Sequence, residues 1–497
     1  MPPRNDRYDV IVVGAGNAAL SAAIAAREGG ANVLVLEKAP EAARGGNSYV
    51  TGGAVRFPYE GIEDLIPLIG EISDAERAQI DVGSYPRSAF YDDLMRVTGG
   101  MSDPELAEIL VNKAYETAIW LRQQGVRWGL MYSRQSFKVD GVFKFWGGLT
   151  CETVGAGKGL VDSLFERTIG LGIDIEYGTM GDHLLIDRMG GIRGIAVRGP
   201  DGLSEIATRS VVLACGGFEA NAEMRTRYLG PGWDLAKVRG TRYNTGDGIR
   251  MALEIGARPH GHYSGCHAVA WDAGAPSEGG DRNIADLFQK HSYPLGLIVN
   301  VNGERFVDEG ADFRNYTYAK YGKEILNQPR RLAFQLFDSQ VTDMLRDEYR
   351  IRETTKFQAD TIRELAVGLD IDADSLVSTV AAYNDAVQET PYNPAILDGK
   401  GTVGITPPKS NWALRLDRPP FTGYAVTCGI TFTFGGLKID TTGRVIDTQD
   451  HPIPGLFAAG ELVGGIFYEN YPGGSGITSG FVFGRIAGTG AAGHAAA

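Results

Sequence analysis

Two glycines and a carboxylate near the N-terminus have the types and the spacing that dinucleotide binding requires. Gly14 and Gly16 follow an apolar run, and Glu37 lies about 20 residues beyond them. The absence of a side chain at Gly16 lets the backbone approach a pyrophosphate, and Glu37 can accept hydrogen bonds from ribose hydroxyls. These residues predict a bound dinucleotide, but FAD and NAD share this signal.

The elements that position these residues are equally recognisable. Residues 10–13 read as a buried parallel strand, residues 18–26 as the following helix and residues 33–36 as a second strand. The N-terminus of the helix offers unpaired N–H groups to phosphates. Ala19 or Ala22 replaces the usual third glycine and is small enough for close packing of helix and strand. Strand, turn, helix, strand and acid occur in the required order.

Similar glycine-rich turns recur along the chain. It marks a buried strand in residues 210–221, a turn and helix in 244–257, and a strand and turn in 455–465. A glycine loop that feeds a final apolar helix occupies residues 471–493. Because both ends of the chain share this pattern, we expect an α/β fold in which a Rossmann-like FAD-binding domain (1–258 and 413–497) carries an inserted α+β capping domain (259–412).

The middle of the chain differs in texture. Residues 294–310 predict a strand, an Asn-Gly hairpin turn and a second strand. Residues 373–389 have the apolar spacing of an amphipathic helix, and the proline-rich residues 391–420 predict an extended return. An insertion of this kind leaves a cleft against the first domain, where ligand sites commonly lie.

Composition and charge exclude several classes of protein. A net charge of −13 without a basic run argues against a nucleic-acid partner, and no apolar stretch reaches the 18 residues of a membrane span. The first strand starts too early for a signal peptide, so we expect a cytoplasmic protein. The four cysteines are widely separated, which predicts reduced thiols and no metal site.

Eight motifs together resemble the flavoprotein family of fumarate reductase, succinate dehydrogenase and 3-ketosteroid dehydrogenase, with tricarballylate dehydrogenase the most similar member. The resemblance covers essentially the whole chain and implies FAD rather than NAD. The motifs are "GAGNAAL", "GGNS…GG", "ACGGF", "TGDGI", "NGERFVDEGADFRNYTYAKYG", "TFTFGGLKID", "AAGE" and "YPGGSGITSGFVFGRIAG".

The resemblance implies a role for residues in each motif. Those implied to contact the pyrophosphate and the adenosine half are Gly14, Gly16, Ala19, Glu37, Lys38, Gly216, Gly217 and Asp247. Those implied at the isoalloxazine and ribitol are Asn47, Ser48, Gly52, Gly53, Gly460, Glu461, Gly474, Ser475, Gly476 and Ile477. Members with covalent FAD carry a histidine in the segment that matches "GGNSYVTGG". This segment has none, so we expect non-covalent FAD.

The substrate residues of fumarate reductases are only partly represented. The family's carboxylate-binding arginine aligns with Tyr471, and its histidine aligns with Phe432. The proton-delivering arginine is represented by Arg314, although Phe313 is its strict counterpart. An ordinary ion pair between Arg314 and Asp312 or Glu309 is the alternative. The "YPGG" loop instead resembles that of 3-ketosteroid dehydrogenases, which implies that Tyr471 donates a hydrogen bond to a carbonyl oxygen.

Polar residues on the cap side complete the list of candidates. They are His267, His291, Arg314, Asn315, Tyr316 and Tyr318. Each histidine can instead be a satisfied structural residue, and the tyrosines can be core aromatics of the cap. Arginine is a poor base unless it relays to a carboxylate. Tyr316 or Tyr471 can serve as the base if neighbouring cations lower its pKa.

The resemblance implies hydrogen transfer across a C–C bond beside a carbonyl or carboxylate, with hydride passing to flavin N5. The leading hypothesis is desaturation of a small, tricarballylate-like carboxylate. The alternatives are a 3-ketosteroid-type ketone desaturase, a fumarate-type C=C reductase and a non-catalytic FAD-binding subunit. The resemblance also implies a separate electron acceptor, such as a membrane-associated iron–sulfur protein, because the chain lacks cluster-ligand cysteines.

Overall fold

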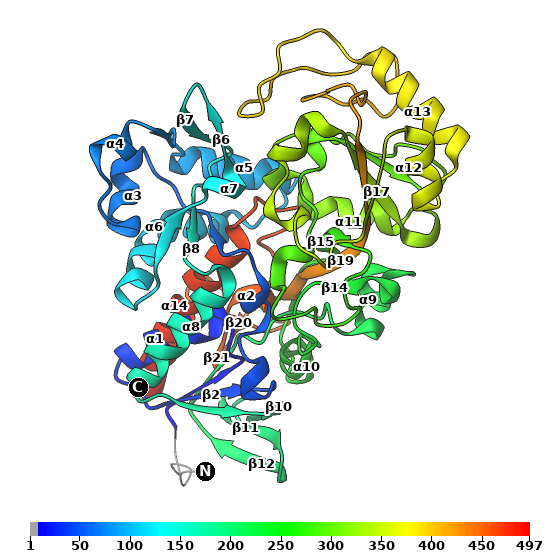
Figure 1. Ribbon diagram of the computed structural model, residues 1–497. Coiled ribbons are helices and arrows are strands. Elements are labelled where there is room, and N and C mark those ends of the chain that lie inside the picture. Colours follow the sequence, from blue (N-terminus) through cyan, green and yellow to red (C-terminus); the bar gives the residue numbers. More distant parts are fainter. Residues whose placement is uncertain (1–7) are drawn as a thin grey trace.

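One mainly parallel sheet organises the N- and C-terminal parts of the computed structural model, which describes residues 8–497 (Figure 1). The strand order is β20-β21-β13-β1-β2-β9. The inner strands are apolar runs buried along their whole length, as expected for a parallel sheet covered on both faces. The strands are β1 (Val10–Val13), β2 (Val33–Glu37), β9 (Asp174–Tyr177), β13 (Ser210–Leu213), β20 (Arg444–Ile446) and β21 (Pro452–Ala458).

Helices cover one face of this sheet and a small antiparallel sheet covers the other. The two inner helices approach closely because glycines face the neighbouring backbone: a Cβ at Gly488 would lie 2.1 Å from the carbonyl oxygen of Ala22. The predicted strands 10–13 and 33–36, the helix after the first and the final helix are confirmed. The covering elements are α1 (Asn17–Glu28), α8 (Ala156–Gly170), α14 (Ser475–Ala496), β10 (Met180–Ile186), β11 (Ile192–Gly199) and β12 (Gly202–Ala207).

A helical lobe between residues 54 and 153 was not anticipated from the sequence. Its longest helix is α6, which Asp103 caps by accepting from the N–H groups of Glu105 and Leu106. Two three-stranded sheets accompany the helices. The lobe contains β3 (Ala54–Val55), α3 (Ile62–Ile69), α4 (Asp74–Arg77), β4 (Ile80–Asp81), α5 (Arg87–Val97), α6 (Pro104–Gln123), β5 (Trp128–Leu130), α7 (Tyr132–Gln135), β6 (Ser136–Val139), β7 (Val142–Phe145) and β8 (Cys151–Thr153).

A second sheet forms the core of the middle region. Leu297 and Val299 of β16 face one apolar cluster with α12 and α13, whereas Ile298 faces the main core with α11, as strand alternation requires. The elements are β14 (Lys237–Val238), β15 (Pro259–Asp272), β16 (Leu297–Asn300), α11 (Tyr318–Leu326), β17 (Ala333–Phe337), β18 (Lys356–Ala359), α12 (Ile362–Leu369), α13 (Ala373–Ala386) and β19 (Phe421–Leu437).

The predicted hairpin in residues 294–310 forms only in part. Its first strand is β16, but beyond the Asn-Gly turn a single bridge joins Val299 to Arg305. The carboxylate of Glu309 accepts from the backbone N–H of Ile298 at 2.8 Å, so a side chain replaces the expected backbone partner. The predicted helix in residues 373–389 is confirmed as α13, and the part of the chain from 391 to 420 is extended, as predicted.

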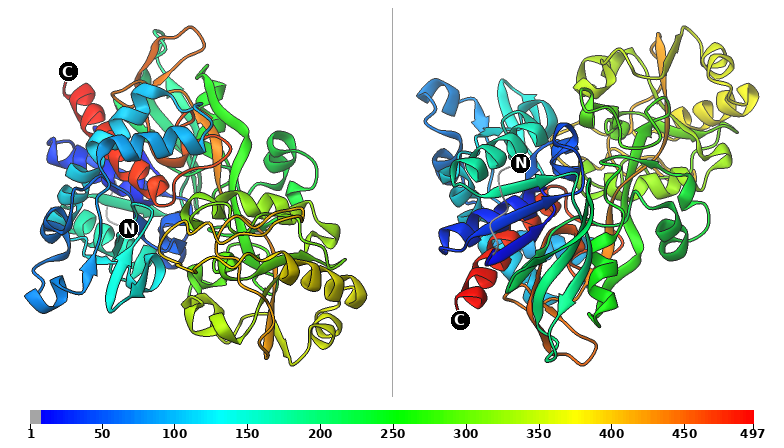
Figure 2. Two further views of the ribbon diagram at one scale, coloured as in Figure 1. Left: turned by 90° about the horizontal axis from the view of Figure 1, so that it is seen from above. Right: turned by 90° about the horizontal axis from the view of Figure 1, so that it is seen from below.

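The middle region lies to one side of the parallel sheet, and Figure 2 shows the yellow-green and yellow segments apart from the blue and red ones. Two strands outside the predicted insertion 259–412, β14 and β19, nevertheless belong to its sheet: β19 pairs with β14 and also with β15 and β17. The division at residues 258/259 and 412/413 therefore stays a prediction.

Further features concern membranes, thiols and metals. No helix within residues 8–497 is long and apolar enough to cross a bilayer. The four cysteines are free, and all except Cys215 are buried. Over the same residues there is no group of three or more His, Cys, Asp or Glu side chains placed to bind a metal ion.

Candidate active site

A cavity of about 210 Å³ lies where the parallel sheet meets the second sheet. Helices α1 and α14 both begin at its wall, and neither Gly16 nor Gly474 caps its helix with a side chain. The first turns of two helices therefore direct backbone N–H groups and partial positive charge at the same space. This arrangement suits an anionic or electron-rich ligand.

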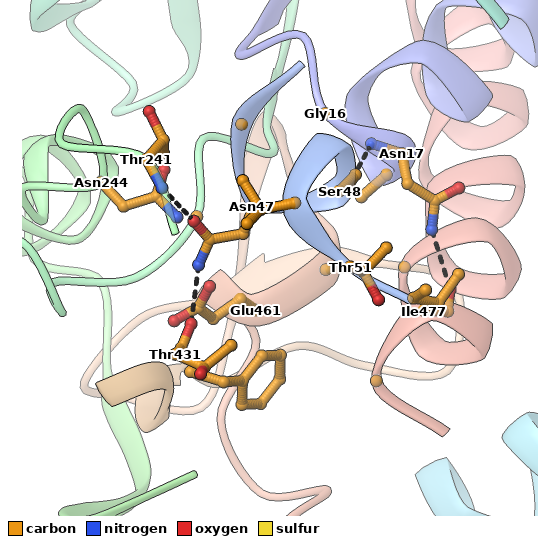
Figure 3. A pocket seen from close by; sticks show the side chains of 18 of the residues that line it. Gly16, Asn17, Asn47, Ser48, Thr51, Thr241, Asn244, Thr431, Glu461 and Ile477 are labelled. Atoms are coloured by element: carbon orange, nitrogen blue, oxygen red, sulfur yellow. Dashed lines mark hydrogen bonds between the residues drawn. The ribbon is translucent and has the colours of Figure 1, made fainter. Parts of the chain in front are cut away.

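Two asparagines join the segments that form the cofactor side of the cavity (Figure 3). The backbone N–H of Asn17 donates to Ser48 Oγ at 2.9 Å, and its side chain donates to the carbonyl of Ile477 at 2.8 Å. Asn47 donates to the carbonyl of Thr431 at 2.6 Å and accepts from the backbone N–H of Thr241 at 2.7 Å. These bonds fix the relative positions of five segments that are far apart in the sequence.

The glycines of the cavity wall pass a direct steric test for a dinucleotide cradle. Gly14 has φ +107°, and a Cβ there would lie 2.5 Å from the carbonyl oxygen of Ala214. The nearest atom to a Cβ at Gly16 is Ser48 Oγ, at 3.3 Å. A side chain is thus excluded by the fold at Gly14, whereas Gly16 keeps space open for a ligand.

A carboxylate and an ion pair line the adenosine side. Glu37 is buried and accepts from the backbone N–H of Ala39 at 2.7 Å, and burial raises its pKa. Lys38 pairs with Asp247 at 2.7 Å and also donates to Thr245 Oγ1. These groups fit ribose hydroxyls at the end of β2.

Glu461 is one member of a buried carboxyl pair. Its Oε1 accepts from the backbone N–H of Thr433 at 2.8 Å. Its neighbour Glu219 accepts from Asn47 and Asn244, each at 2.6 Å. Burial and the proximity of Glu461 raise the pKa of Glu219 well above its usual value. Burial also raises the pKa of Glu461, so the two buried carboxyls share one proton as a pair.

The residues implied for cofactor binding fall into two groups. Those on the cavity wall are Gly14, Gly16, Glu37, Lys38, Asn47, Ser48, Gly52, Gly216, Asp247, Gly460, Glu461, Gly474, Gly476 and Ile477. Those behind the wall are Ala19, Gly53, Gly217 and Ser475. Gly53 and Gly217 instead allow close packing, because a Cβ would lie 2.5 Å from Thr153 Oγ1 and 2.1 Å from Thr433 Oγ1 respectively.

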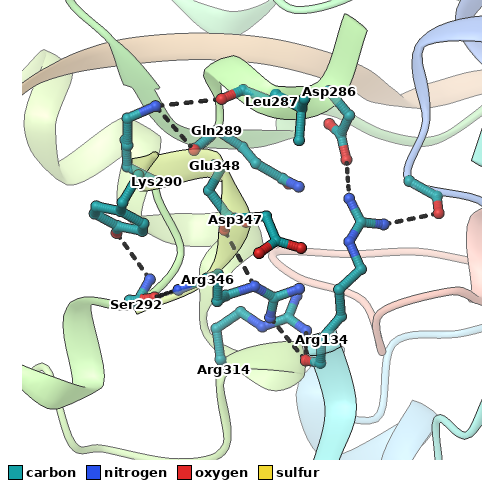
Figure 4. A network of polar contacts seen from close by, with 12 residues as sticks. Arg134, Asp286, Leu287, Gln289, Lys290, Ser292, Arg314, Arg346, Asp347 and Glu348 are labelled. Atoms are coloured by element: carbon teal, nitrogen blue, oxygen red, sulfur yellow. Dashed lines mark hydrogen bonds and ion pairs between the residues drawn. The ribbon is translucent and has the colours of Figure 1, made fainter. Parts of the chain in front are cut away.

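Four arginines line the opposite half of the cavity. Figure 4 shows three of them, Arg134, Arg314 and Arg346. Arg134 and Arg239 share Asp286, with Arg134 Nη2 3.3 Å from Asp286 Oδ2. Arg346 pairs with Glu348 at 3.1 Å and donates to the backbone carbonyl of Arg134 at 2.8 Å. The fourth arginine is Arg314, on the short helix η5 (Arg314–Tyr316).

Arg314 differs from the other three in having no carboxylate within ion-pairing distance among residues 8–497. Its Nη2 donates to Gln135 Oε1 at 2.6 Å, and its Nε has no partner. The alternative ion pair of Arg314 with Asp312 or Glu309 does not form. Glu309 pairs with Arg305 instead, and Asp312 pairs with Arg96. Burial, reinforced by nearby Arg346, lowers the pKa of Arg314 to about 9.

Two tyrosines stand beside these arginines. The hydroxyls of Tyr318 and Tyr471 lie 2.6 Å apart, and the Tyr471 ring stacks on Phe432 at 6.0 Å. His267 packs against both tyrosines, and burial lowers its pKa well below its usual value. Burial raises the pKa values of both tyrosines. Burial therefore outweighs the effect of nearby Arg239 on the pKa of Tyr471, and the role of Tyr471 as a base stays a prediction.

Three other candidates lie outside this cavity. Tyr316 is directed away: its hydroxyl donates to Asp93 Oδ2 and to the carbonyl of Gly147, and burial raises its pKa. His291 lines a neighbouring cavity rather than this one, and both of its ring nitrogens lack partners. Asn315 is buried and also donates to the carbonyl of Gly147. Tyr316 is thus a linker between the lobe and the middle region.

Sequence reasoning missed several residues of the site. Arg134, Arg239, Arg346 and Asp286 line the cavity but belong to no recognised motif. Only Arg239 carried a usable signal, because it lies shortly before "TGDGI" in the sequence. Glu219 was overlooked although it directly follows the "ACGGF" motif.

Comparison with known proteins agrees with this geometry. The FAD binding domain family model matches residues 9–477. A probable fumarate reductase of Shewanella frigidimarina is 30% identical over 99% of this chain and 76% of its own. A 3-oxosteroid 1-dehydrogenase of Mycobacterium tuberculosis is 28% identical over 97% of each chain. The open conformation of a flavocytochrome c3 fumarate reductase superposes with a TM-score of 0.73 at 28% identity, covering 99% of this chain and 79% of the other.

Fold and site together define an FAD-dependent oxidoreductase that acts on CH–CH groups. The chain belongs to the FAD-binding flavoprotein family that includes fumarate reductases and 3-ketosteroid dehydrogenases.

Proposed function

We propose that the protein reduces a C=C bond conjugated to the carboxylate of a small organic acid, in the manner of a fumarate reductase. One observation carries this proposal. Arg314 is a buried cation on the cavity wall without a carboxylate partner among the described residues. An uncompensated buried charge is costly, and a substrate carboxylate would supply the missing partner.

The residues divide the work as follows. Arg314 binds the carboxylate and, with its pKa lowered to about 9, can release a proton to the substrate α-carbon and recover it. The Tyr318–Tyr471 hydroxyl pair donates to a substrate oxygen, and Phe432 excludes water from the same wall. FAD bound in its reduced form would supply the hydride. Negative charge that develops on the carboxylate during transfer is stabilised by preorganised cations.

We further propose that FAD is bound without a covalent link. The segment that covers the flavin side, residues 45–53, contains no histidine. Acid precipitation should therefore release all yellow colour into the supernatant. Flavin absorbance that stays with the washed polypeptide contradicts this part of the proposal.

The direction of the reaction is open to a direct experiment. The anaerobic enzyme is reduced with dithionite and mixed with fumarate, acrylate or aconitate, and flavin reoxidation is followed at 450 nm. In parallel, the oxidised enzyme is mixed with succinate or tricarballylate to look for bleaching. Reoxidation of the reduced flavin by an enoate supports the proposed C=C reductase. Bleaching of the oxidised flavin by tricarballylate would instead support the tricarballylate-like desaturase. If neither occurs, the carboxylate proposal fails.

A second candidate, desaturation of a ketone, is favoured by the Tyr318–Tyr471 pair. Two neutral hydroxyls 2.6 Å apart suit a carbonyl oxygen as well as a carboxylate. A dehydrogenase for 3-oxosteroids is among the relatives. Bleaching by a cyclic ketone but by no carboxylic acid distinguishes this candidate. Electrons would be exchanged with a separate redox partner, and an iron–sulfur protein remains the class we propose.

A further inference from the structure

A buried arginine lies directly behind the start of α14. Arg56 is fully buried and directly follows β3. Its backbone N–H donates to Thr478 Oγ1 at 3.1 Å, and its carbonyl accepts from the same hydroxyl at 2.8 Å. Its Nε donates to the carbonyl of Gly473 at 2.8 Å. Because Gly473 and Gly474 line the active-site cavity, the guanidinium bonds directly to the back of the cavity wall.

No carboxylate in the part of the chain that the structure describes neutralises Arg56 directly. Its Nη1 donates to the carbonyl of Gly147 at 3.0 Å and to the hydroxyl of Tyr316 at 3.3 Å, and its Nη2 has no partner. Burial opposes the charge, but the neighbouring Tyr316 and Asp93 outweigh it and raise the pKa of Arg56, so the side chain stays charged. Buried charges are normally paired, and an anion in the cavity would offset this one.

One carboxylate is linked to Arg56 indirectly, through two tyrosines. Asp93 Oδ2 accepts from the hydroxyls of Tyr85, at 2.8 Å, and Tyr316. The guanidinium of Arg56 lies over the rings of both tyrosines, 5.1 Å and 5.2 Å from their centroids. Asp93 Oδ1 lies 3.0 Å from Arg96 Nη2, so its charge is shared with a second arginine. The cluster presents its positive end to the cavity wall, because Arg56 bonds to the wall and Asp93 does not.

The wall behind which Arg56 lies is the one at which we expect the isoalloxazine, through Gly474, Gly476 and Ile477. Two electrons and one proton convert neutral oxidised flavin into an anionic reduced form above neutral pH. A fixed cation behind this wall stabilises the anion, and burial strengthens its effect. We propose that Arg56 raises the reduction potential of the bound FAD. The inference rests on FAD binding and on neither the direction nor the substrate of the reaction.

The test measures the flavin potential of the holoenzyme without any substrate. The protein is reduced slowly and anaerobically at about pH 8 beside a redox dye, and absorbance gives the ratio of reduced to oxidised flavin at each dye ratio. Arg56→Met should lower this ratio about tenfold, which is about 30 mV for a two-electron couple. Arg56→Lys keeps the charge and should stay within about threefold of wild type. Arg122→Met is the control and should cause no shift, because Arg122 also donates to a backbone carbonyl, that of Leu68, but lies outside the cavity wall.

Asp93→Asn tests the opposite sign. The amide oxygen still accepts from both tyrosine hydroxyls but carries no charge, so the ratio of reduced to oxidised flavin should rise about threefold. A purely structural role of Arg56 predicts equal shifts for Arg56→Met and Arg56→Lys and no rise for Asp93→Asn, and either result overturns the inference. If Arg56→Met loses its flavin, Asp93→Asn alone decides. Because no substrate is added, the outcome does not depend on the proposed C=C reduction.

Discussion

The cofactor half and the substrate half of the main cavity are built in opposite ways. The cofactor half uses backbone: Gly14 and Gly16, two helix N-termini and carbonyl-bound asparagines. The substrate half uses long side chains, four arginines and two tyrosines, which come from segments scattered between residues 134 and 471. Backbone sites leave local signatures in sequence, whereas converging side chains do not.

A substitution at a backbone position of the cofactor half is the strongest test of this contrast between the two halves. Gly16→Val should give a folded protein with less than about a tenth of the wild-type flavin, because the new side chain occupies the phosphate space. The ratio of absorbance at 450 and 280 nm after purification measures this loss. Gly170→Val is the control, since a Cβ there meets nothing within 4 Å. Full flavin content in Gly16→Val places the nucleotide elsewhere.

This contrast explains which predictions succeeded. The β1–α1–β2 unit, α10 (Asp247–Glu254), α13 and α14 were predicted because each has its own periodicity and glycine boundaries. The helical lobe was missed although Asp103 and Pro104 mark the start of α6. The prediction of a second hairpin strand was wrong because the side chain of Glu309, rather than a neighbouring backbone, accepts from the N–H of Ile298. This tertiary contact leaves no local signal in the sequence. Arg134 and Arg346 could not be predicted from the sequence either, because only the tertiary fold brings them to the cavity.

On the substrate half, Arg314→Lys should lower kcat/KM by about 10²–10³ with flavin content unchanged. A lysine cannot make the two-pronged contact of a guanidinium with a carboxylate. Stopped-flow reoxidation of the reduced enzyme measures the effect. Arg330→Lys, at an exposed surface pair, is the control and should behave as wild type. A wild-type rate for Arg314→Lys would remove Arg314 from the site.

The pH profile examines the same cation without mutation. Because burial lowers the pKa of Arg314 to about 9, the cation is present below that pH and lost above it. Log kcat/KM should be flat between about pH 6.5 and 8.5 and fall by about one unit per pH unit above about 9. His267 adds no inflection near neutrality, because its pKa is lowered well below the usual value. A fall centred near pH 6.5 implicates a histidine instead.

Tyr471→Phe should have a smaller effect than Arg314→Lys if the substrate is a carboxylate. It removes one neutral hydrogen bond and leaves the Phe432 stack intact, which costs about 1–2 kcal/mol, or roughly 5–30-fold in rate. Tyr49→Phe, on a residue outside the cavity wall, controls for the loss of a tyrosine hydroxyl. A larger loss in Tyr471→Phe than in Arg314→Lys reverses the order of the two functional candidates.

The smallest expected effect concerns the cofactor half, where Glu219 and Glu461 share a proton. The raised pKa of Glu219 means that the folded protein keeps a proton that the unfolded chain loses above about pH 4.5. Wild-type stability therefore falls as pH rises from there towards the folded pKa, whereas a glutamine has no proton to lose. Glu219→Gln should match wild-type Tm near pH 5 and exceed it by about 1–4 °C near pH 8.5. Flavin content should stay near wild type, because the amide still bonds Asn47 or Asn244.

Glu205→Gln on the exposed β12 is the control. A Tm difference that does not change with pH shows that both carboxyls are ionised, and Glu461 then needs no protonated partner.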